Sequence, residues 1–397
     1  MPTIKLIKIN IVTTLLLLSF FISKNSCAFE EILIWTSNEG AGSAINEIKS
    51  EFEQSFKTKV KVEVLNKDLT SLFKTASLTG KGPDILIWAN DVSGELAQSG
   101  LIEPLEELPF LTDNFLPVSL KAFRYKGRLY GYPYAFESLV LFRNPKLVPA
   151  EPKSFEEIEQ YSLDLKKKSS DNHGFLFDFK TFFFSFPLLN ASGGYIFGEN
   201  AKGLNSSDVG VNHEGFIRGM DFLKRLKESG LIPSSIDRGI SFEKFKLGKL
   251  AYTIDGPWAV KDLESASVPY KMSPLPTLYG KPSKPFVGVH GFMIRRSSKN
   301  KLLAKELIEK YFLSPKGMKT FYQFDHRAPA HKRVLAELSQ VDSKLDVYKR
   351  SAEVGVAMPN IPQMGSVWGA MGKALSLVLE QNKASRESLN QARDQIK

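Results

Sequence analysis

Three tryptophans stand at positions in this sequence that suit contact with a ligand. Trp88, Trp258 and Trp368 each lie where a strand or loop passes into a helix. A large ring is hard to bury on all sides at such an edge, and an aromatic face can stack on the C–H faces of sugars or on flat ligands. Trp35, by contrast, lies inside an apolar strand and is expected to be a core residue. The first three rings are therefore candidates for ligand stacking, with simple packing as the alternative.

Three carboxylates are candidates to bind the hydroxyl groups of a ligand, because an ionised carboxylate accepts strong hydrogen bonds. Asp91 follows Trp88 at the start of a predicted helix, so its alternative role is an N-cap. Glu137 lies in an otherwise apolar strand, where an unpaired buried carboxylate is costly, and we expect it to be paired or to line a cleft. Glu39 lies in a glycine-flanked loop after the first strand, where a plain surface acid is the alternative.

Motifs for catalysis, metals and cofactors are weak or missing in the sequence. Asp91 and Glu137 could form the acid pair of a glycosidase, although their separation does not follow from the sequence. The segment from Glu39 resembles the start of a dinucleotide-binding loop, but Ile45 stands where the third glycine belongs. G-x-S-x-G, Walker A, H-E-x-x-H and EF-hand motifs are absent, and one cysteine with five histidines supplies no zinc cluster. We therefore predict no catalytic residue, no metal site and no cofactor.

The segment that follows the N-terminal region alternates between strand and helix patterns. Short apolar runs predict strands at 31–36, 59–64 and 84–89, and apolar residues at helical spacing predict a helix at 43–56. This alternation predicts a parallel sheet covered by helices. Such sheets bind ligands beyond the carboxyl ends of their strands, which is where Trp88 lies.

The remaining chain continues with strands and helices of an α/β protein. The run 132–142 predicts one long apolar strand that crosses between two lobes, because it is long and has no turn. The phenylalanine-rich run 175–186 predicts packed core with one or two rings that face a cleft. Further strands are predicted within 250–258 and 286–294, and helices within 155–168, 214–230, 300–312, 368–382 and 384–397.

The N-terminus has the order of a secretory signal peptide, with two early lysines, an apolar run at 11–22 and small residues up to Ala28. We expect cleavage after Ala28 and localisation in the periplasm. The apolar run is shorter than the roughly twenty residues that span a bilayer. A lipidated Cys27 is the alternative, but Lys24 and Asn25 differ from the small apolar residues that usually precede such a cysteine.

The length and charge of the chain limit the number of lobes and the kinds of partner that can be expected. A chain of 397 residues favours two lobes, and a formal net charge of +10 raises the question of an anionic partner. Lysines alternate with acids over most of the length, as at 156–168 and 300–312, so the excess charge indicates solvated helical faces. We therefore predict no nucleic-acid partner. An anionic ligand or an anionic envelope surface remains open as the reason for the charge.

Five segments of the chain carry a resemblance to a known family. They are TGKGPDILIWANDVSGELAQSGLIEPL at 79–105, YPYAFESLVLFRNPKLVP at 132–149, TIDGPWA at 253–259, KPSKPFVGV at 281–289 and MPNIPQMGSVW at 358–368. In this order, from about Glu31 to the C-terminus, the chain resembles the periplasmic maltose/maltodextrin-binding proteins of bacterial ABC importers.

The resemblance implies a two-lobed periplasmic binding protein fold, in which each lobe is a sheet flanked by helices and a ligand cleft lies between the lobes. The N-terminal lobe would comprise 29–135 and 292–337, and the C-terminal lobe 140–286 and 344–397. The crossing segments would lie near 136–139, 287–291 and 338–343.

The resemblance also implies a set of sugar-binding residues. Trp88, Ala89 and Asp91 match the strand end that contacts sugar in the family, and Glu137 matches the carboxylate of the crossing strand. Glu39 stands where the family has an aspartate. The remaining matches belong to the second lobe and its stacking rings: Phe183, Trp258, Met358 and Trp368.

Four positions depart from the family pattern by losing a polar side chain or shortening it. Gly40 replaces a lysine, Val92 an arginine, Thr181 a glutamate and Gly372 an arginine, while Phe183 keeps the ring of a tyrosine without its hydroxyl. A buried hydrogen bond to a charged group contributes about 1.5–3 kcal/mol. These losses favour weaker maltodextrin binding or a different disaccharide.

The expected function is capture of a maltose- or maltodextrin-like oligosaccharide and its delivery to an ABC permease with its ATPase. The protein would act as a monomer and not as an enzyme. The alternatives are a binder of a different disaccharide, a protein that presents its ligand to a chemoreceptor, and a secreted glycosidase.

Overall fold

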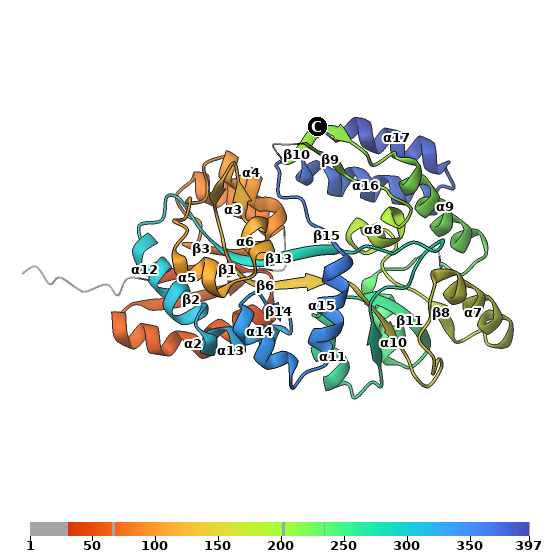
Figure 1. Cartoon of the computed structure of the whole chain (residues 1–397), viewed down its shortest axis with the longest axis horizontal. Helices are drawn as coiled ribbons and strands as arrows, with labels where there is room; N and C mark the ends of the chain where they lie inside the picture. The colour runs from red at the N-terminus through yellow and green to blue at the C-terminus, as the bar shows by residue number, and fades with distance from the viewer. Residues whose placement is uncertain (1–30, 66–67, 201–202, 234, 397) are drawn as a thin grey trace, which may run out of the picture.

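The computed structural model describes residues 31–65, 68–200, 203–233 and 235–396. It has two lobes, each built on its own sheet, which lie to the left and right in Figure 1 and are called the N-terminal and C-terminal lobes. This architecture confirms the predicted two-lobed α/β fold class. The predicted signal peptide, including the cleavage point after Ala28 and the alternative at Cys27, lies outside the described residues.

The N-terminal lobe begins with the predicted strand–helix alternation. Strand β1 (Glu31–Thr36) pairs in parallel with both β2 (Lys59–Val64) and β3 (Ile85–Ala89). Helices α2 (Glu39–Phe56) and α3 (Leu69–Leu78) connect these strands. The carboxyl ends of β1 and β3 therefore meet at one edge of the sheet, as predicted.

Strands from much later in the chain complete this sheet. Its order is β14-β6-β13-β3-β1-β2, with β15 (Val356–Ala357) beside β13. Strand β13 (Phe286–Ile294) is antiparallel to β3 on one side and to β6 (Tyr132–Ser138) on the other. Strand β14 (Ala328–Pro329) pairs with β6 at the edge. The middle of the N-terminal lobe thus depends on β13.

The C-terminal lobe has a four-stranded sheet in the order β12-β7-β11-β8. Strand β11 (Leu250–Asp255) is antiparallel to β7 (Val140–Arg143) and parallel to β8 (His173–Phe175), and β12 (Lys271–Ser273) is the edge beside β7. The helices of this lobe are α7 (Phe155–Lys168), α8 (Phe182–Asn190), α9 (Glu214–Glu228), α10 (Arg238–Lys246), α11 (Ala259–Ser265), α16 (Met364–Leu379) and α17 (Ser385–Gln395).

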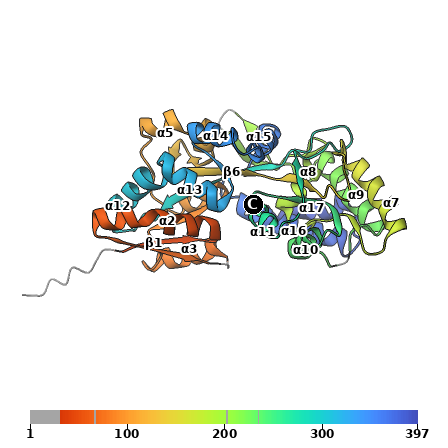
Figure 2. The same cartoon turned by 90° about the horizontal axis from the view of Figure 1, so that it is seen from below.

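The remaining elements surround the two sheets. The N-terminal lobe also holds η1 (Asn90–Val92), α4 (Ser93–Gln98), α5 (Pro109–Asn114), α6 (Pro117–Ala122), α12 (Lys301–Glu306), the π-helical turn η2 (Leu307–Phe312), α13 (Pro315–Asp325) and α14 (Lys332–Ser339). Two hairpins are β4 (Arg124–Tyr125) with β5 (Arg128–Leu129), and β9 (Phe197–Asn200) with β10 (Gly203–Val209). Helix α15 (Lys344–Val354) contacts β6 and β7 and lies between the lobes in Figures 1 and 2.

The run 132–142 forms two strands in different sheets, so the prediction of one continuous strand was wrong. Ser138 in β6 pairs with Val287 of the N-terminal lobe, whereas Val140 in β7 pairs with Asp255 of the C-terminal lobe. Leu139 between them is fully buried. The apolar pattern predicts burial, and burial continues through Leu139. It does not predict which strand pairs with each part of the run.

The loop predicted around Glu39 is the first turn of α2. Asn38 is the N-cap, and its side-chain oxygen accepts a hydrogen bond from the Ala41 amide at 3.2 Å. The glycines at 40 and 42, which favoured a loop in the sequence, lie inside this turn. Glu39 is therefore held by a helix rather than by a flexible loop.

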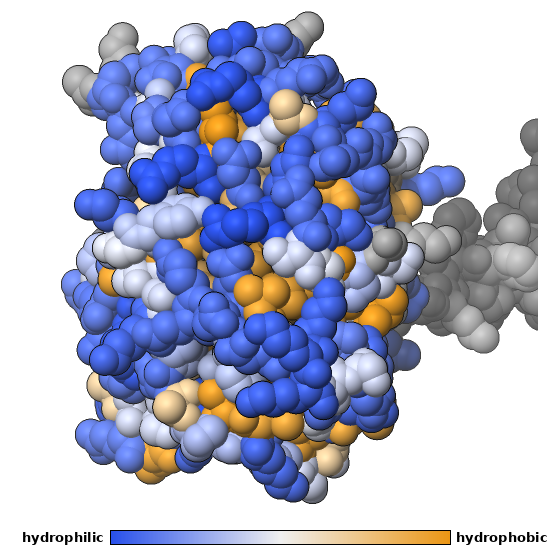
Figure 3. Space-filling model, turned by 90° about the vertical axis from the view of Figure 1, so that its right-hand side faces the viewer, coloured by the Kyte–Doolittle hydropathy of each residue, from blue (hydrophilic) through white to orange (hydrophobic). Residues whose placement is uncertain are grey.

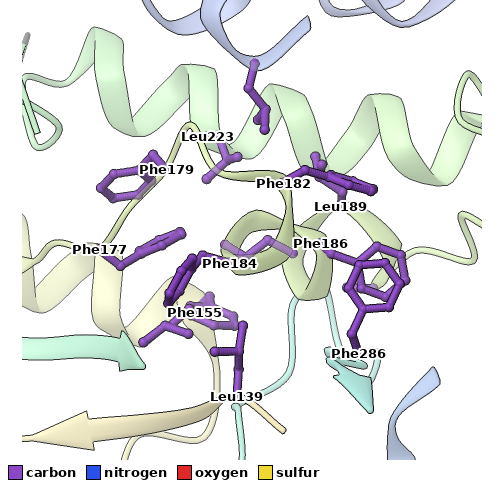
Figure 4. Packing of buried hydrophobic residues seen from close by; sticks show 14 of the residues in the cluster. Leu139, Phe155, Phe177, Phe179, Phe182, Phe184, Phe186, Leu189, Leu223 and Phe286 are labelled. Atoms are coloured by element: carbon purple, nitrogen blue, oxygen red, sulfur yellow. The ribbon is translucent and has the colours of Figure 1, made fainter. Parts of the chain in front are cut away.

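The phenylalanine-rich run forms the core of the C-terminal lobe, as predicted (Figure 4). Phe186 stacks on Phe286 with ring centroids 3.6 Å apart and planes 6° apart. Phe183 and Phe184, from the same run, also reach the space between the lobes. The core therefore supports two rings that face a cleft.

The outer face of the C-terminal lobe is mostly hydrophilic, with hydrophobic residues in separate groups (Figure 3). In the part of the chain that the structure describes, no helix is both long enough and apolar enough to cross a membrane. The buried hydrophobic residues gather in two clusters, one around each sheet.

Candidate ligand-binding cleft

A cleft of about 1010 Å³ lies between the two lobes. Its lining contains every residue predicted to bind a ligand: Glu39, Trp88, Ala89, Asp91, Glu137, Phe183, Trp258, Met358 and Trp368. These residues come from β3, β6, α2, α8, α16 and the loops beside them, which are far apart in the sequence. The fold therefore brings the predicted set together in one cavity.

The residue after β3, Asn90, is held to β13 and to the segment after β15 by its buried side-chain amide. Asn90 Nδ2 donates a hydrogen bond to the Met358 carbonyl at 2.9 Å, and Asn90 Oδ1 accepts one from the Val289 amide at 3.0 Å. Asn90 is fully buried. This pair of hydrogen bonds holds Asp91 and Met358 beside each other at the cleft.

The two carboxylate oxygens of Asp91 lie in different surroundings. Trp368 Nε1 donates a hydrogen bond to Asp91 Oδ2 across the cleft at 3.1 Å. Asp91 Oδ1 is buried and has no hydrogen-bond partner among the described residues. Burial raises the pKa of Asp91 to about 7 despite the Trp368 hydrogen bond. Asp91 lies within η1 and caps neither η1 nor α4, so the alternative role of N-cap is wrong.

Glu137 is both paired and part of the cleft lining, which confirms the expectation for a carboxylate in an apolar strand. Arg327 Nε donates a hydrogen bond to Glu137 Oε2, and His290 Nε2 lies 3.1 Å from the same oxygen. Burial opposes ionisation of Glu137, but His290 and Arg327 outweigh it and lower the pKa of Glu137 to about 2.

A second carboxylate extends this buried network. Arg327 Nη1 also donates to Asp325, and Tyr134 Oη donates to Asp325 Oδ2 at 2.9 Å. Asn38 Nδ2, at the start of α2, donates to Asp325 Oδ1 at 2.6 Å. We call Glu137, Asp325 and Arg327, with the groups bonded to them, the polar wall of the cleft.

The opposite side of the cleft is built from aromatic rings of the C-terminal lobe. The ring centroid of Trp258 lies 6.2 Å from that of Phe183 and 6.3 Å from that of Phe184. Trp368 packs against Phe286 of the core with centroids 5.8 Å apart. We call Phe183, Phe184, Trp258 and Trp368 the aromatic wall. The Arg327 guanidinium lies 5.4 Å from the Trp258 ring centroid, so the two walls touch.

Several charged residues of the cleft were missed by the sequence analysis. Arg327, Asp325 and His290 line it, as does Arg238, whose Nε donates to both oxygens of Asp255 at 3.0 and 3.1 Å. Burial raises the pKa of Asp255, although Arg238 opposes this shift. His290 and Asp255 stand in apolar strands, the same signal that singled out Glu137, and could have been found by it.

The four departures from the family pattern differ in their relation to the cleft. Val92 and Gly40 line it, whereas Thr181 and Gly372 lie outside its lining. The Thr181 hydroxyl donates to Asp178 at 2.8 Å. A Cβ on Gly40 would lie 2.5 Å from the Phe324 carbonyl oxygen, so α2 and α13 leave no room for a side chain there. The loss of the lysine at position 40 therefore has a packing reason.

Two sheets with separate cores, and a cleft whose polar wall faces an aromatic wall, define a two-lobed ligand-binding protein. Residues 47–352 match the family described as bacterial extracellular solute-binding protein, and the chain belongs to this family. The family consists of binding proteins, so the chain is a binding protein and the hypothesis of a secreted glycosidase is set aside.

Curated relatives match almost the whole chain. A galactooligosaccharide-binding protein of Bacillus subtilis is 30% identical over 94% of this chain and 90% of its own length. A maltodextrin-binding protein of the same organism is 27% identical over 89% of this chain and 88% of its own. A maltooligosaccharide ABC transporter solute-binding lipoprotein of Streptococcus pneumoniae is 27% identical over 94% of this chain and 89% of its own.

Proposed function

We propose that the protein binds a maltodextrin-like oligosaccharide in this cleft and delivers it to an ABC permease with its ATPase. The observation that carries the proposal is the pairing of the polar wall with the aromatic wall around the unsatisfied Asp91 Oδ1. A pyranose ring has apolar C–H faces and a rim of hydroxyl groups, so it needs both kinds of surface. The volume of about 1010 Å³ supports a ligand of several rings.

Each wall has a distinct task in the proposed complex. Trp258 and Phe183 offer ring faces for stacking, while Asp91 Oδ1 and Glu39 accept hydrogen bonds from sugar hydroxyls. Arg327 has five N–H donors, and those not bonded to Glu137 or Asp325 can reach sugar oxygens. Glu137 and Asp325 both pair with Arg327, so its positive charge is compensated within the protein.

Ligand capture would proceed by closure of the two lobes. The ligand favours the closed state only through contacts that it makes there and not in the open state. A micromolar dissociation constant needs about 8 kcal/mol of binding free energy. A stacking pair with several hydrogen bonds to charged groups is of that order.

The proposal includes the setting in which the protein works. We propose the periplasm, with the signal peptide cleaved after Ala28, and action as a monomer with the lobe boundaries given above. The relative of Streptococcus pneumoniae is named a lipoprotein, which keeps anchoring through Cys27 as the alternative. Presentation of the ligand to a chemoreceptor would be a further use of the closed state.

A galactooligosaccharide is the second candidate ligand, because the relative with 30% identity carries that name. Calorimetry and tryptophan fluorescence with maltose, maltotriose, a galactooligosaccharide, trehalose and sucrose would separate the two. We expect saturable binding of maltotriose that Trp258→Ala weakens strongly and that Trp35→Phe preserves, because Trp35 bonds to Glu63 and not to the cleft. Binding of the galactooligosaccharide alone would assign the second candidate, and silence with all five sugars would refute both.

A further inference from the structure

A second cavity lies in the C-terminal lobe, behind the aromatic wall. It has a volume of about 390 Å³ and is lined by residues of α8, the β9–β10 hairpin and the segment that begins with β15. Val356, Ala357 and Pro359 line it, whereas Met358 between them lines the main cleft. The two cavities therefore lie on opposite sides of this segment.

A buried amide oxygen at this cavity lacks a partner. Asn190, the last residue of α8, is 5% exposed, and its Oδ1 has no hydrogen-bond partner in the described part of the chain. Buried polar atoms are nearly always satisfied, so Asn190 Oδ1 needs a donor, which a ligand hydroxyl or a water molecule can supply. Ser192 Oγ, in the adjoining hollow that Asn190 also lines, is likewise buried and unpartnered there.

An aromatic ring also lines this cavity. Tyr195 is 37% exposed and its ring packs against Gly210, while its hydroxyl donates to Asp208 at 2.9 Å. The hydroxyl is thus satisfied within the protein, and the ring supplies apolar area. An acceptor residue and an exposed aromatic ring in one cavity suit a ligand with hydroxyl donors on its rim and C–H groups on its face.

We infer that this cavity is a second sugar site, which takes a single neutral pyranose. Its volume is within the range of small-molecule sites but well below that of the main cleft. The smaller volume favours a single sugar ring over an oligosaccharide. Phe186 lines this cavity and stacks on Phe286, which contacts Trp368 of the aromatic wall. A sugar bound here thus lies two rings away from the main cleft. The inference does not depend on the ligand proposed for that cleft.

The test titrates the full protein with the monosaccharides D-galactose and D-glucose. Saturation-transfer NMR detects the binding of each sugar. We expect binding of at least one sugar that persists in Trp258→Ala and weakens about tenfold or more in Asn190→Ala, which removes the acceptor. Ala357 lines the cavity and is exposed, so Ala357→Trp should fill the cavity without disturbing the fold. This variant tests the site even if Asn190→Ala fails to fold. Ala150→Trp, also exposed but outside both cavities, is the matched control and should leave binding unchanged.

Three results would overturn the inference. The first is loss of monosaccharide binding in Trp258→Ala with retention in Ala357→Trp, which would place the sugar in the main cleft. The second is the absence of saturable binding of either sugar. The third is a crystal soaked with the bound sugar in which only a water molecule occupies the site at Asn190 Oδ1.

Discussion

The polar wall and the aromatic wall hold their side chains by different physical means. In the polar wall, Arg327 is fixed by two buried carboxylates, and each carboxylate has further partners from other elements. In the aromatic wall, ring packing on the core of the C-terminal lobe holds Trp258 and Phe183 in place, and Trp258 also lies against Arg327. One wall supplies direction through charges and the other supplies area.

The two walls should therefore differ in the substitutions that they tolerate. Removal of one charge from the polar wall leaves other buried charges without compensation, so the damage exceeds the single contact. Removal of one ring from the aromatic wall costs the contact area of that ring, and its neighbours can adjust. We therefore expect stability to depend more on the polar wall and ligand affinity more on the aromatic wall.

The largest effect is expected for Arg327→Met in the polar wall. Glu137 and Asp325 would remain buried without their shared cation, and the free energy of unfolding should fall by about 3–5 kcal/mol. Urea unfolding followed by circular dichroism measures this. The matched control is Arg333→Met, because Arg333 pairs with Glu337 while its side chain is 76% exposed. That change should cost less than about 1 kcal/mol, and equal losses would contradict the role of the polar wall.

Trp258→Ala is the corresponding change in the aromatic wall. We expect the affinity for the sugar that binds the cleft to fall by about 2–4 kcal/mol, because a stacking ring and its desolvated pocket are lost. Titration calorimetry gives the value, and Trp258→Phe should recover part of it. If Trp258→Ala lowered the free energy of unfolding as much as Arg327→Met does, the division of tasks between the walls would be wrong.

Substitution of two glycines by alanine tests how tightly the elements behind each wall are packed. Gly40 lies where α2 meets α13 beneath the polar wall, and Gly40→Ala should cost about 1–3 kcal/mol because its Cβ meets the Phe324 carbonyl. Gly369 lies on α16 next to Trp368, and a methyl group added there would meet no atom within 4 Å. Gly369→Ala should stabilise α16 by about 0.5–1 kcal/mol. Thermal unfolding of both variants measures these changes. If both substitutions stabilised the protein, or both destabilised it, the expected difference in packing would be wrong.

The two cleft carboxylates should respond to pH in opposite directions. The pKa of Glu137 is lowered from 4.5 to about 2, so its stabilisation is present above pH 4.5 and is lost as the pH falls towards 2. The pKa of Asp91 is raised from 3.8 to about 7, so its contribution is present below pH 3.8 and is lost as the pH rises through 7.

Asp91→Asn isolates the second effect. In this variant the decline of the free energy of unfolding between pH 4 and 7 should disappear, since its side chain does not titrate. Sugar affinity of the unmodified protein should rise between pH 6 and 8 by up to about tenfold, because ionised Asp91 is the stronger acceptor. An affinity of Asp91→Asn that still rises over this range would show that another group titrates.

Local patterns predicted much of the fold and of the cleft. The alternation of apolar runs in 31–89 predicted the parallel strands, and the acid at 137 in an apolar strand predicted a paired, cleft-lining carboxylate. These features depend on periodicity and on the cost of burying charge, both of which act over a few residues.

Long-range pairing accounts for what the sequence analysis missed. Arg327 stands 190 positions from Glu137, and no spacing rule links them. The division of 132–142 at Leu139 depends on two partner strands, β13 and β11, that lie more than a hundred positions later. Trp258 and Trp368 were predicted from their positions where a strand or loop passes into a helix, and Phe183 from the resemblance. The polar wall was predicted only in part, because Asp325 and Arg327 carried neither signal.

The central position of β13 in the N-terminal sheet has a consequence for folding during synthesis. Strands β3 and β6 have no common neighbour until residues 286–294 have been synthesised, so both keep an open edge for most of translation. Such non-local pairing also makes folding slow. We therefore expect the N-terminal sheet to stay incomplete until most of the chain has been synthesised.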